Sequence, residues 1–150
     1  MPRILEIHRD NFTISTDPAR LDKDAIAEML KRAYWAQGRP RERVDRSLAN
    51  SLVFGLYDGN KQIGLARVVS DYAIFAYLCD VFIHEDYRAQ GLGKWLMQTV
   101  HSHPDLQGLR RWTLATRDAH ELYRQFGWDR LASPDKWMEI LNPFPGEGRD

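Results

Sequence analysis

The segment from Asp80 to Val100 places the tightest constraint on how this chain can fold. It reads Asp-Val-Phe-Ile-His-Glu-Asp-Tyr-Arg-Ala-Gln-Gly-Leu-Gly-Lys-Trp-Leu-Met-Gln-Thr-Val, an apolar run followed by a charged turn and an amphipathic stretch. Two glycines separated by one residue, Gly91 and Gly93, let the backbone turn tightly and approach a ligand closely. The apolar residues from Leu92 onward recur at helical spacing. The segment therefore predicts a strand, a glycine turn and a helix whose N-terminus can face an anion.

The glycine turn suits a pyrophosphate but differs from two better-known phosphate motifs. Arg88 and Lys94 add positive charge beside the free amides of the turn. A Gly-x-Gly-x-x-Gly dinucleotide turn needs glycine where this chain has Leu96, and the phosphate loop of NTPases needs four residues between its first glycine and Gly-Lys-Ser/Thr. The alternative is an ordinary connection whose glycines only cap the helix.

Length and composition predict one domain. The chain has 150 residues, of which 43% are hydrophobic and 11% aromatic, enough for one core and too few for two. We expect a single domain over 1–150, with its core at roughly 12–141 and a loose tail at 142–150 that contains two prolines and two glycines. The 21 basic and 21 acidic residues cancel, which argues against a general nucleic-acid or membrane-surface binder.

Cysteine content and apolar runs predict a cytoplasmic protein. Cys79 is the only cysteine, so an intrachain disulfide is excluded. The first residues lack the apolar core of a secretory signal, and no apolar run reaches the 18 residues that suggest a membrane span.

The periodicity of apolar residues predicts an alternation of strands and helices. Asp58-Gly59-Asn60 reads as a turn between two strands, because its glycine permits positive φ. The expected strands are residues 11–16, 52–57, 62–70, 75–84, 110–116 and 137–141, and the expected helices, besides the one after Gly93, are residues 21–34, 41–50 and 119–126.

The pattern Arg88-x-x-Gly91-x-Gly93 resembles the signature of the GNAT superfamily of acyl-CoA-dependent N-acyltransferases. Residues 77–84 (Tyr-Leu-Cys-Asp-Val-Phe-Ile-His) are similar to the central strand of that family, and residues 85–88 (Glu-Asp-Tyr-Arg) to its approach to the loop. Residues 119–128 (Ala-His-Glu-Leu-Tyr-Arg-Gln-Phe-Gly-Trp) resemble its second hallmark, Ala-x-x-Leu/Phe-Tyr-x-x-x-Gly-Phe. The resemblance implies an α/β (α+β) GNAT fold: a central, mixed, mostly antiparallel sheet of six to seven strands with a splayed central strand, flanked by about four helices.

The same resemblance implies acetyl-CoA as co-substrate and no metal. Relatives often carry Asn seven residues before the hallmark tyrosine, where this chain has Thr116, whose hydroxyl offers one contact to the pantetheine arm. The cofactor-binding residues implied are Val81, Phe82, Ile83, Arg88, Ala89, Gln90, Gly91, Leu92, Gly93, Lys94, Thr116 and Tyr123.

The chemistry of amide formation assigns roles to some of these residues. An alkylammonium with a pKa of about 10.4 must lose its proton before it attacks. The thioester oxygen then gathers charge, which a backbone amide of the segment Val81 to Ile83 can stabilise. The thiolate leaves, and a tyrosine hydroxyl can protonate it. Tyr123 holds the hallmark position and is the expected acid; the alternative is a tyrosine packed under the sheet for structural reasons.

Asp80 is the candidate general base, because relatives use a carboxylate on this strand, often through water. Since side chains alternate along a strand, the alternative is a structural acid that is hydrogen-bonded near the strand end. His84 and Glu85 are weaker candidates at the turn, and Cys79 stands where some polyamine-acetylating relatives have Glu. The histidines at 101, 103 and 120 lack the cysteine pair or carboxylate cluster of a zinc site.

The connection at residues 34–43 is the expected acceptor side of the groove. Tyr34, Trp35 and Arg39 could hold a flat or anionic substrate through cation-π contacts, while a packed aromatic pair and a solvated basic turn remain equal alternatives. Small amines, amino acids, aminoglycosides and protein N-termini or lysines all stay open as acceptors.

The leading hypothesis is an N-acetyltransferase that transfers an acetyl group from acetyl-CoA to a primary amine by direct attack, since no nucleophile with a suitable partner is evident. The rival is a non-catalytic acyl-CoA-binding or regulatory module. A third reading, an unrelated phosphate-binding α/β domain, predicts a preference for nucleotides over CoA. Relatives are commonly homodimers, but the sequence shows no obvious dimer interface.

Overall fold

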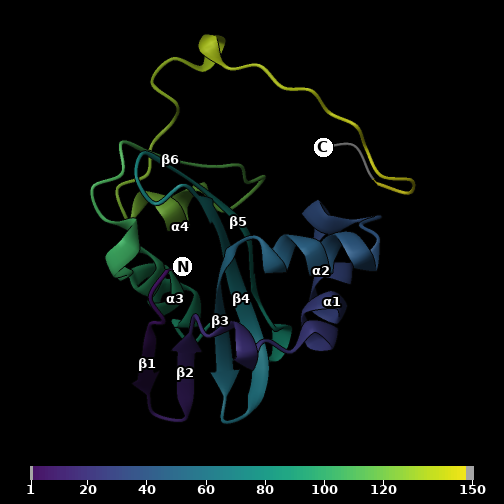
Figure 1. The fold of residues 1–150 in the computed structure, drawn as a ribbon, viewed down its shortest axis with the longest axis vertical. Helices are drawn as coiled ribbons and strands as arrows, with labels where there is room; N and C mark the ends of the chain where they lie inside the picture. The colour runs from purple at the N-terminus through teal and green to yellow at the C-terminus, as the bar shows by residue number, and fades with distance from the viewer. Residues whose placement is uncertain (1, 148–150) are drawn as a thin grey trace.

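One sheet of six strands forms the centre of the computed structural model, which describes residues 2–147 (Figure 1). The strands stand in the same order in space as along the chain. Neighbouring strands are antiparallel except the last two, which run parallel because a helix crosses over between them. The strands are β1 (Glu6–Arg9), β2 (Phe12–Ser15), β3 (Leu52–Asp58), β4 (Lys61–Ser70), β5 (Phe75–Ile83) and β6 (Arg111–Leu114).

Helices cover both faces of this sheet. On one face lie α3 (Leu92–Ser102) and α4 (His120–Arg124), and on the other lie α1 (Lys23–Lys31) and α2 (Arg41–Ala49) (Figure 1). Successive residues of β3 show the alternation that a two-faced sheet requires, since Val53 packs toward α1 and α2 while Phe54 packs toward α3. The mixed sheet between two helical layers confirms the expected α/β fold class.

The first helix is shorter than the predicted 21–34. Asp22 caps it by accepting a hydrogen bond from the Ala25 N–H at 3.0 Å, and the helix ends at Lys31. Tyr34 to Ala36 instead form a separate 3-10 turn, after Ala33 adopts an extended conformation. The apolar periodicity is shared by the helix and the turn, so it did not reveal the break between them.

Strand β5 carries a β-bulge at the centre of the sheet. Between the paired residues Cys79 and Phe82, the two residues Asp80 and Val81 face only Ala66 of β4. Asp80 has φ of +50°, in the left-handed region. A bulge re-aims side chains locally and bends its strand, which changes where Asp80 points relative to a regular strand.

The second half of β5 separates from β6. Parallel pairing with β6 covers only Phe75 to Leu78, so the segment after Leu78 has no strand beside it on that edge within the described residues. This is the splayed central strand that the resemblance implies. The separation leaves backbone groups of β5 facing open space.

Two sequence-based strand assignments need correction. The prediction of a strand at residues 137–141 is wrong, because in the described part of the chain these residues join no sheet. Conversely, β1 was not predicted, because only one of its four residues is even partly buried and it therefore lacks apolar alternation. Strand propensity indicates that a segment can extend, whereas pairing also needs a free edge in reach.

The C-terminal segment crosses back over the molecule to the connection between α1 and α2 (Figure 1). Gly38 has φ of +77°, and a Cβ atom there would lie 2.7 Å from the Pro145 carbonyl oxygen and 2.9 Å from the Glu147 nitrogen. The segment closes with a turn in which the Glu147 N–H donates to the Phe144 carbonyl at 2.9 Å. The expected loose tail thus has contacts up to Glu147, and its residues 148–150 lie outside the described residues.

None of the helices within residues 2–147 is both long enough and apolar enough to cross a membrane.

Replacing Gly38 with Ala should release the C-terminal segment. Positive φ costs an L-residue about 1–2 kcal/mol, and the added Cβ also strikes backbone atoms that cannot rotate away. Gly59→Ala is the matched control, because Gly59 has φ of +58° and nothing within 4 Å of a Cβ. Both variants should lose stability, but only Gly38→Ala should speed hydrogen exchange at the amides of Phe144, Gly146 and Glu147. Equal exchange in both variants would show that the contact does not hold the segment.

Candidate active site

The gap between β5 and β6 opens into a cleft of about 420 Å³. Its walls come from the α1–α2 connection, the bulged half of β5, the end of β6 and the start of α4. The fold brings together here seven of the residues that the sequence singled out: Tyr34, Trp35, Arg39, Asp80, Val81, Thr116 and Tyr123.

Asp80 is the centre of a buried ionic cluster in this cleft. Its side chain is 1% exposed and lies 2.8 Å from the Arg39 guanidinium and 2.7 Å from that of Arg67. The Trp35 indole N–H donates a third hydrogen bond to the same carboxylate at 2.8 Å. The bulge directs the carboxylate to where all three donors converge.

The charge of Asp80 is well compensated. Burial by itself raises the pKa of the carboxyl group, but the attraction of Arg39 and Arg67 and their hydrogen bonds outweigh this, so the pKa of Asp80 is lowered. A carboxylate with three donors and a lowered pKa is a weak base. The geometry therefore favours the structural alternative for Asp80 over the general-base role.

The weaker base candidates at the turn, Glu85 and His84, also have hydrogen-bond partners. Glu85 forms a two-point ion pair with Arg32, whose hydrogen bonds lower the pKa of Glu85 to about 2. The His84 Nδ1 atom accepts a hydrogen bond from the Asp86 N–H at 3.1 Å.

The acceptor side of the cleft is aromatic and basic. The Tyr34 and Trp35 rings pack edge to face at 5.1 Å between centroids, and the Arg117 guanidinium lies 3.8 Å from the centre of the Tyr34 ring. The Tyr34 hydroxyl accepts a hydrogen bond from the Arg117 N–H at 2.8 Å. Tyr34 thus joins the α1–α2 connection to the loop after β6 and closes one end of the cleft. No motif or spacing in the sequence distinguishes Arg117.

Tyr123 also lines the cleft. The residue is 8% exposed, and burial raises the pKa of its hydroxyl to about 12. The phenol therefore keeps its proton throughout the neutral range and can donate it. Thr116 lies nearby, where its hydroxyl accepts a hydrogen bond from the Ala119 N–H at 3.2 Å and keeps its own proton to donate.

The glycine turn forms a row of free amides at the N-terminus of α3. Among the described residues, the N–H groups of 89–94 have no acceptor, and both Ala89 and Gly91 have positive φ, at +63° and +79°. Such a turn at a helix start presents several N–H groups to one anion. A Cβ at Gly91 would meet nothing within 4 Å, so the face of the turn is open.

Two arginines lie beside this turn. The Arg88 Nε atom donates to the Ile83 carbonyl at 2.9 Å, which ties the turn to the end of β5. Arg9 of β1 lies over the Trp95 ring at 4.7 Å, and its guanidinium is 3.5 Å from the Gly91 carbonyl oxygen. Sequence reasoning missed Arg9, because β1 itself was not predicted and 82 residues separate Arg9 from Gly91.

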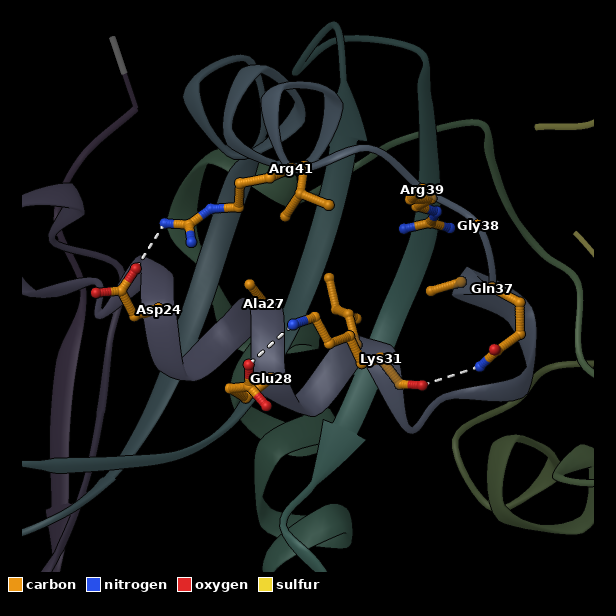
Figure 2. Close-up of a pocket in the computed structure, with 11 residues that line it drawn as sticks. Asp24, Ala27, Glu28, Lys31, Gln37, Gly38, Arg39 and Arg41 are labelled. Atoms are coloured by element: carbon orange, nitrogen blue, oxygen red, sulfur yellow. Dashed lines mark hydrogen bonds and ion pairs between the residues drawn. The ribbon is translucent and has the colours of Figure 1, made fainter. Parts of the chain in front are cut away.

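A second hollow of about 340 Å³ lies between α1 and α2 (Figure 2). Its acidic and basic side chains neutralise one another: Asp24 lies 2.9 Å from Arg41, and Glu28 lies 3.1 Å from Lys31. Arg39 borders this hollow as well but makes its ion pair with Asp80. With its acidic and basic side chains paired, this hollow offers no evident catalytic group. The β5–β6 cleft, which contains Asp80, Thr116 and Tyr123, is the candidate site.

No group of three or more histidine, cysteine or acidic residues within 2–147 is arranged to hold a metal ion. His103 is fully buried and uses both ring nitrogens within the fold, and the His101 ring accepts a hydrogen bond from the Trp128 indole at 3.0 Å.

Comparison with known proteins shows which family this chain belongs to. The acetyltransferase (GNAT) domain profile matches residues 49–130, which include the glycine turn, β6 and α4. The chain belongs to the GNAT acetyltransferase family. A protein of Gibberella zeae whose name carries the term acetyltransferase is 33% identical over 138 residues, covering 77% of each chain. The GNAT resemblance and the expected acyltransferase class are therefore confirmed.

Solved GNAT structures share this architecture. A GNAT-family protein from Xanthomonas campestris has 44% identity and a TM-score of 0.85, over 88% of this chain and 94% of its own. A GNAT acetyltransferase from Elizabethkingia anophelis, solved with acetyl-CoA bound, has 17% identity and a TM-score of 0.64, over 89% of this chain and 90% of its own. The second likeness is one of fold.

Removing the charge of Asp80 should destabilise this GNAT domain strongly. Asp80→Asn leaves Arg39 and Arg67 uncompensated in a buried place, for which we expect a loss of about 3 kcal/mol in the free energy of unfolding. Asp118→Asn, at an exposed position of the same cleft, should change stability by less than about 0.5 kcal/mol. Urea unfolding at neutral pH measures both.

The effect should also depend on pH. The pKa of Asp80 is lowered in the folded state, so its contribution is complete above the ordinary carboxyl pKa and disappears as the pH falls through the folded value. The stability difference between wild type and Asp80→Asn should therefore shrink in acid. A difference that stays constant down to the acid transition would contradict the ion-pair account.

Proposed function

We propose that this protein is an N-acetyltransferase that transfers the acetyl group of acetyl-CoA to a primary amine by direct attack. The observation that carries the proposal is the position of the splayed half of β5. It joins the anion-accepting turn at one end to the cleft that contains Tyr123 at the other.

The residues of the turn fit the pyrophosphate of the coenzyme. The free N–H groups of 89–94 and the positive end of α3 can meet phosphate oxygens without a side chain in the way, because Gly91 faces open space. Arg88, Lys94 and Arg9 supply compensating positive charge around the turn. Acetyl-CoA, when bound, supplies the activated thioester. The residues of this chain bind the coenzyme and orient that thioester.

The open edge of β5 fits the acyl end. The His84 N–H donates to Ile63 on the β4 side at 2.7 Å. Because successive residues of a regular strand direct their N–H groups to opposite sides, that of Ile83 faces the open side, and Val81 lies in the bulge beside the same edge. An amide fixed in this way can stabilise the oxyanion that forms when an amine attacks a thioester. Phe82 offers no donor to the acyl group, because it pairs with Leu65 of β4 and its side chain packs in the core toward α1.

Tyr123 is the proposed acid for the departing thiolate. It lines the cleft beside Thr116, and its raised pKa of about 12 keeps the phenol protonated at neutral pH. Thr116 can donate its hydroxyl proton to an oxygen of the pantetheine arm, since its oxygen already caps the start of α4.

Asp80 is a positioning residue in this proposal. Its carboxylate holds Trp35 and Arg39 against the acceptor side of the cleft, and Tyr34 completes that wall through Arg117. The amine enters between this wall and the open edge of β5. The rival, a non-catalytic acyl-CoA-binding module, needs the turn but has no use for a protonated tyrosine in the cleft.

Calorimetric titration with acetyl-CoA, run beside ATP, tests the coenzyme site. Wild-type protein should bind acetyl-CoA and not ATP. Gly91→Val should weaken binding by roughly tenfold or more, since a β-branched residue both strains the turn at φ of +79° and blocks its open face. Gly108→Val is the matched control: its φ is +72°, it also faces open space, and it lies outside the turn. Preference for ATP, or equal loss in both variants, would reject the assigned site.

Replacing Tyr123 with Phe should lower kcat about 100-fold while the KM for acetyl-CoA changes little, because only the proton donor is lost. Tyr77→Phe is the control, since Tyr77 lines the same cleft but has no assigned role. Steady-state kinetics with a primary-amine panel give both values. Unchanged kcat in Tyr123→Phe would remove the tyrosine as acid, and binding of acetyl-CoA without turnover of any amine would favour the non-catalytic rival.

A further inference from the structure

Arg39 and Arg67 carry more positive charge than their shared partner, Asp80, can neutralise. Both guanidinium groups bond to that one carboxylate, at 2.8 Å and 2.7 Å. Within residues 2–147 neither arginine has a second acidic partner, so two cations and one anion leave a surplus positive charge. The two arginine side chains are only 23% and 13% exposed. Because solvent screens a charge poorly in such a place, the surplus attracts an anion strongly.

Part of the hydrogen-bonding capacity of these two arginines is also unused. A guanidinium has five N–H donors in a fixed planar fork. Arg39 donates to Asp80 through Nη1 alone, at 2.8 and 3.0 Å. Arg67 donates through Nε to Asp80 at 2.7 Å and through Nη1 to the Ser51 hydroxyl at 3.1 Å. The Nε and Nη2 groups of Arg39 and the Nη2 group of Arg67 therefore have no acceptor in the described part of the chain.

These unused N–H groups are not sealed inside the protein. Among the described residues, the Tyr57 hydroxyl is the only fully buried side-chain polar atom without a partner, so the unused guanidinium nitrogens keep contact with solvent. Arg39 lines the β5–β6 cleft directly. Arg67 pairs across the sheet with Cys79, which lines the same cleft, and adds its charge close by. Arg39 is therefore the residue that a ligand in the cleft can touch.

The position of Arg39 brings an anion close to the proposed acyl site. Its guanidinium is bound to Asp80, and the next residue, Val81, lies in the bulge beside the open edge of β5. Consecutive Cα atoms are only about 3.8 Å apart. An acceptor that reaches from Arg39 to the thioester therefore needs only a few bonds between its anionic group and its amine.

Resting on the proposed acetyltransferase activity, we propose that the acceptor is a small amine that also carries a carboxylate or phosphate group, which the unused N–H groups of Arg39 bind. The planar fork of a guanidinium matches both anions and forms charge-assisted hydrogen bonds with them. Apart from the Asp80 cluster, the charged residues that line the cleft are Arg117 and Asp118. Both are exposed and opposite in sign, so they leave the surplus at Arg39 in place.

Steady-state kinetics with matched pairs of acceptors test this specificity. β-Alanine is compared with β-alaninamide, and O-phosphoethanolamine with ethanolamine, so that the members of each pair differ in the anionic group. Nα-acetyl-lysinamide represents the lysines of proteins. Wild-type enzyme should have a kcat/KM roughly tenfold or more higher for the anionic member of at least one pair. The pair that shows the preference identifies the anion as carboxylate or phosphate.

Variants of Arg39 test whether this residue causes the preference. Arg39→Gln should remove most of it, because kcat/KM falls more for the anionic member of a pair. Arg39→Lys keeps a positive charge beside Asp80 and should remain folded, but it lacks the planar fork and should reduce the preference by roughly fivefold or more. Arg41→Gln is the matched control: Arg41 pairs with Asp24 and Asp45 and borders the α1–α2 hollow but not the cleft, so the preference should persist.

Three results would contradict this specificity. Equal kcat/KM within both pairs, or a preference that survives in both Arg39 variants, would overturn it and leave the proposed acetyltransferase activity standing. A kcat/KM for the lysine derivative above that of all four small amines would likewise overturn it. Turnover of none of these amines would overturn the proposed function itself, and the anionic acceptor with it.

Discussion

The bulge at Asp80 is the constraint on which the rest of this structure depends. It places one carboxylate in the interior, where Arg39, Arg67 and the Trp35 indole converge on it. All three donors come from outside β5: Arg67 from β4, and Arg39 and Trp35 from the α1–α2 connection. A buried carboxylate needs such partners, because an uncompensated charge in the interior costs several kcal/mol. The same cluster that neutralises Asp80 therefore holds the acceptor side of the cleft against the sheet.

The bulge and the splay of β5 together create the cleft. Parallel pairing with β6 stops at Leu78, and beyond it β5 turns backbone groups toward open space. Buried or half-buried backbone groups without partners are rare in folded proteins and mark places where something else binds. In this protein the open edge leads to the glycine turn, where the amides of 89–94 have no acceptor in the described part of the chain. The open edge of β5 and the glycine turn together form a continuous row of backbone N–H and C=O groups. This row suits a long ligand that has an anionic part and a carbonyl part.

The outer edge of β6 is also unpaired. Within residues 2–147, β6 pairs with β5 alone, and residues 137–141 join no strand. The prediction of a final strand thus recognised the propensity of this segment correctly but assigned it to the wrong place, because propensity does not say which edge a strand joins. The same limit explains why β1, which has mostly exposed side chains, was missed.

The sequence by itself determined the local features: the strand, glycine turn and helix around Gly91, the alternation in β3 and β4, and the hallmark tyrosine at 123. These depend on neighbours within a few residues, where spacing and backbone preference act directly. Only the tertiary structure decided what happens between distant residues. It pairs Asp80 with Arg39 and Arg67, and it places Arg9 beside the glycine turn. Within the described residues, it leaves residues 137–141 outside the sheet. The physical reason is that charge compensation, pKa and strand pairing depend on which groups meet in space, and spacing along the chain does not specify those contacts.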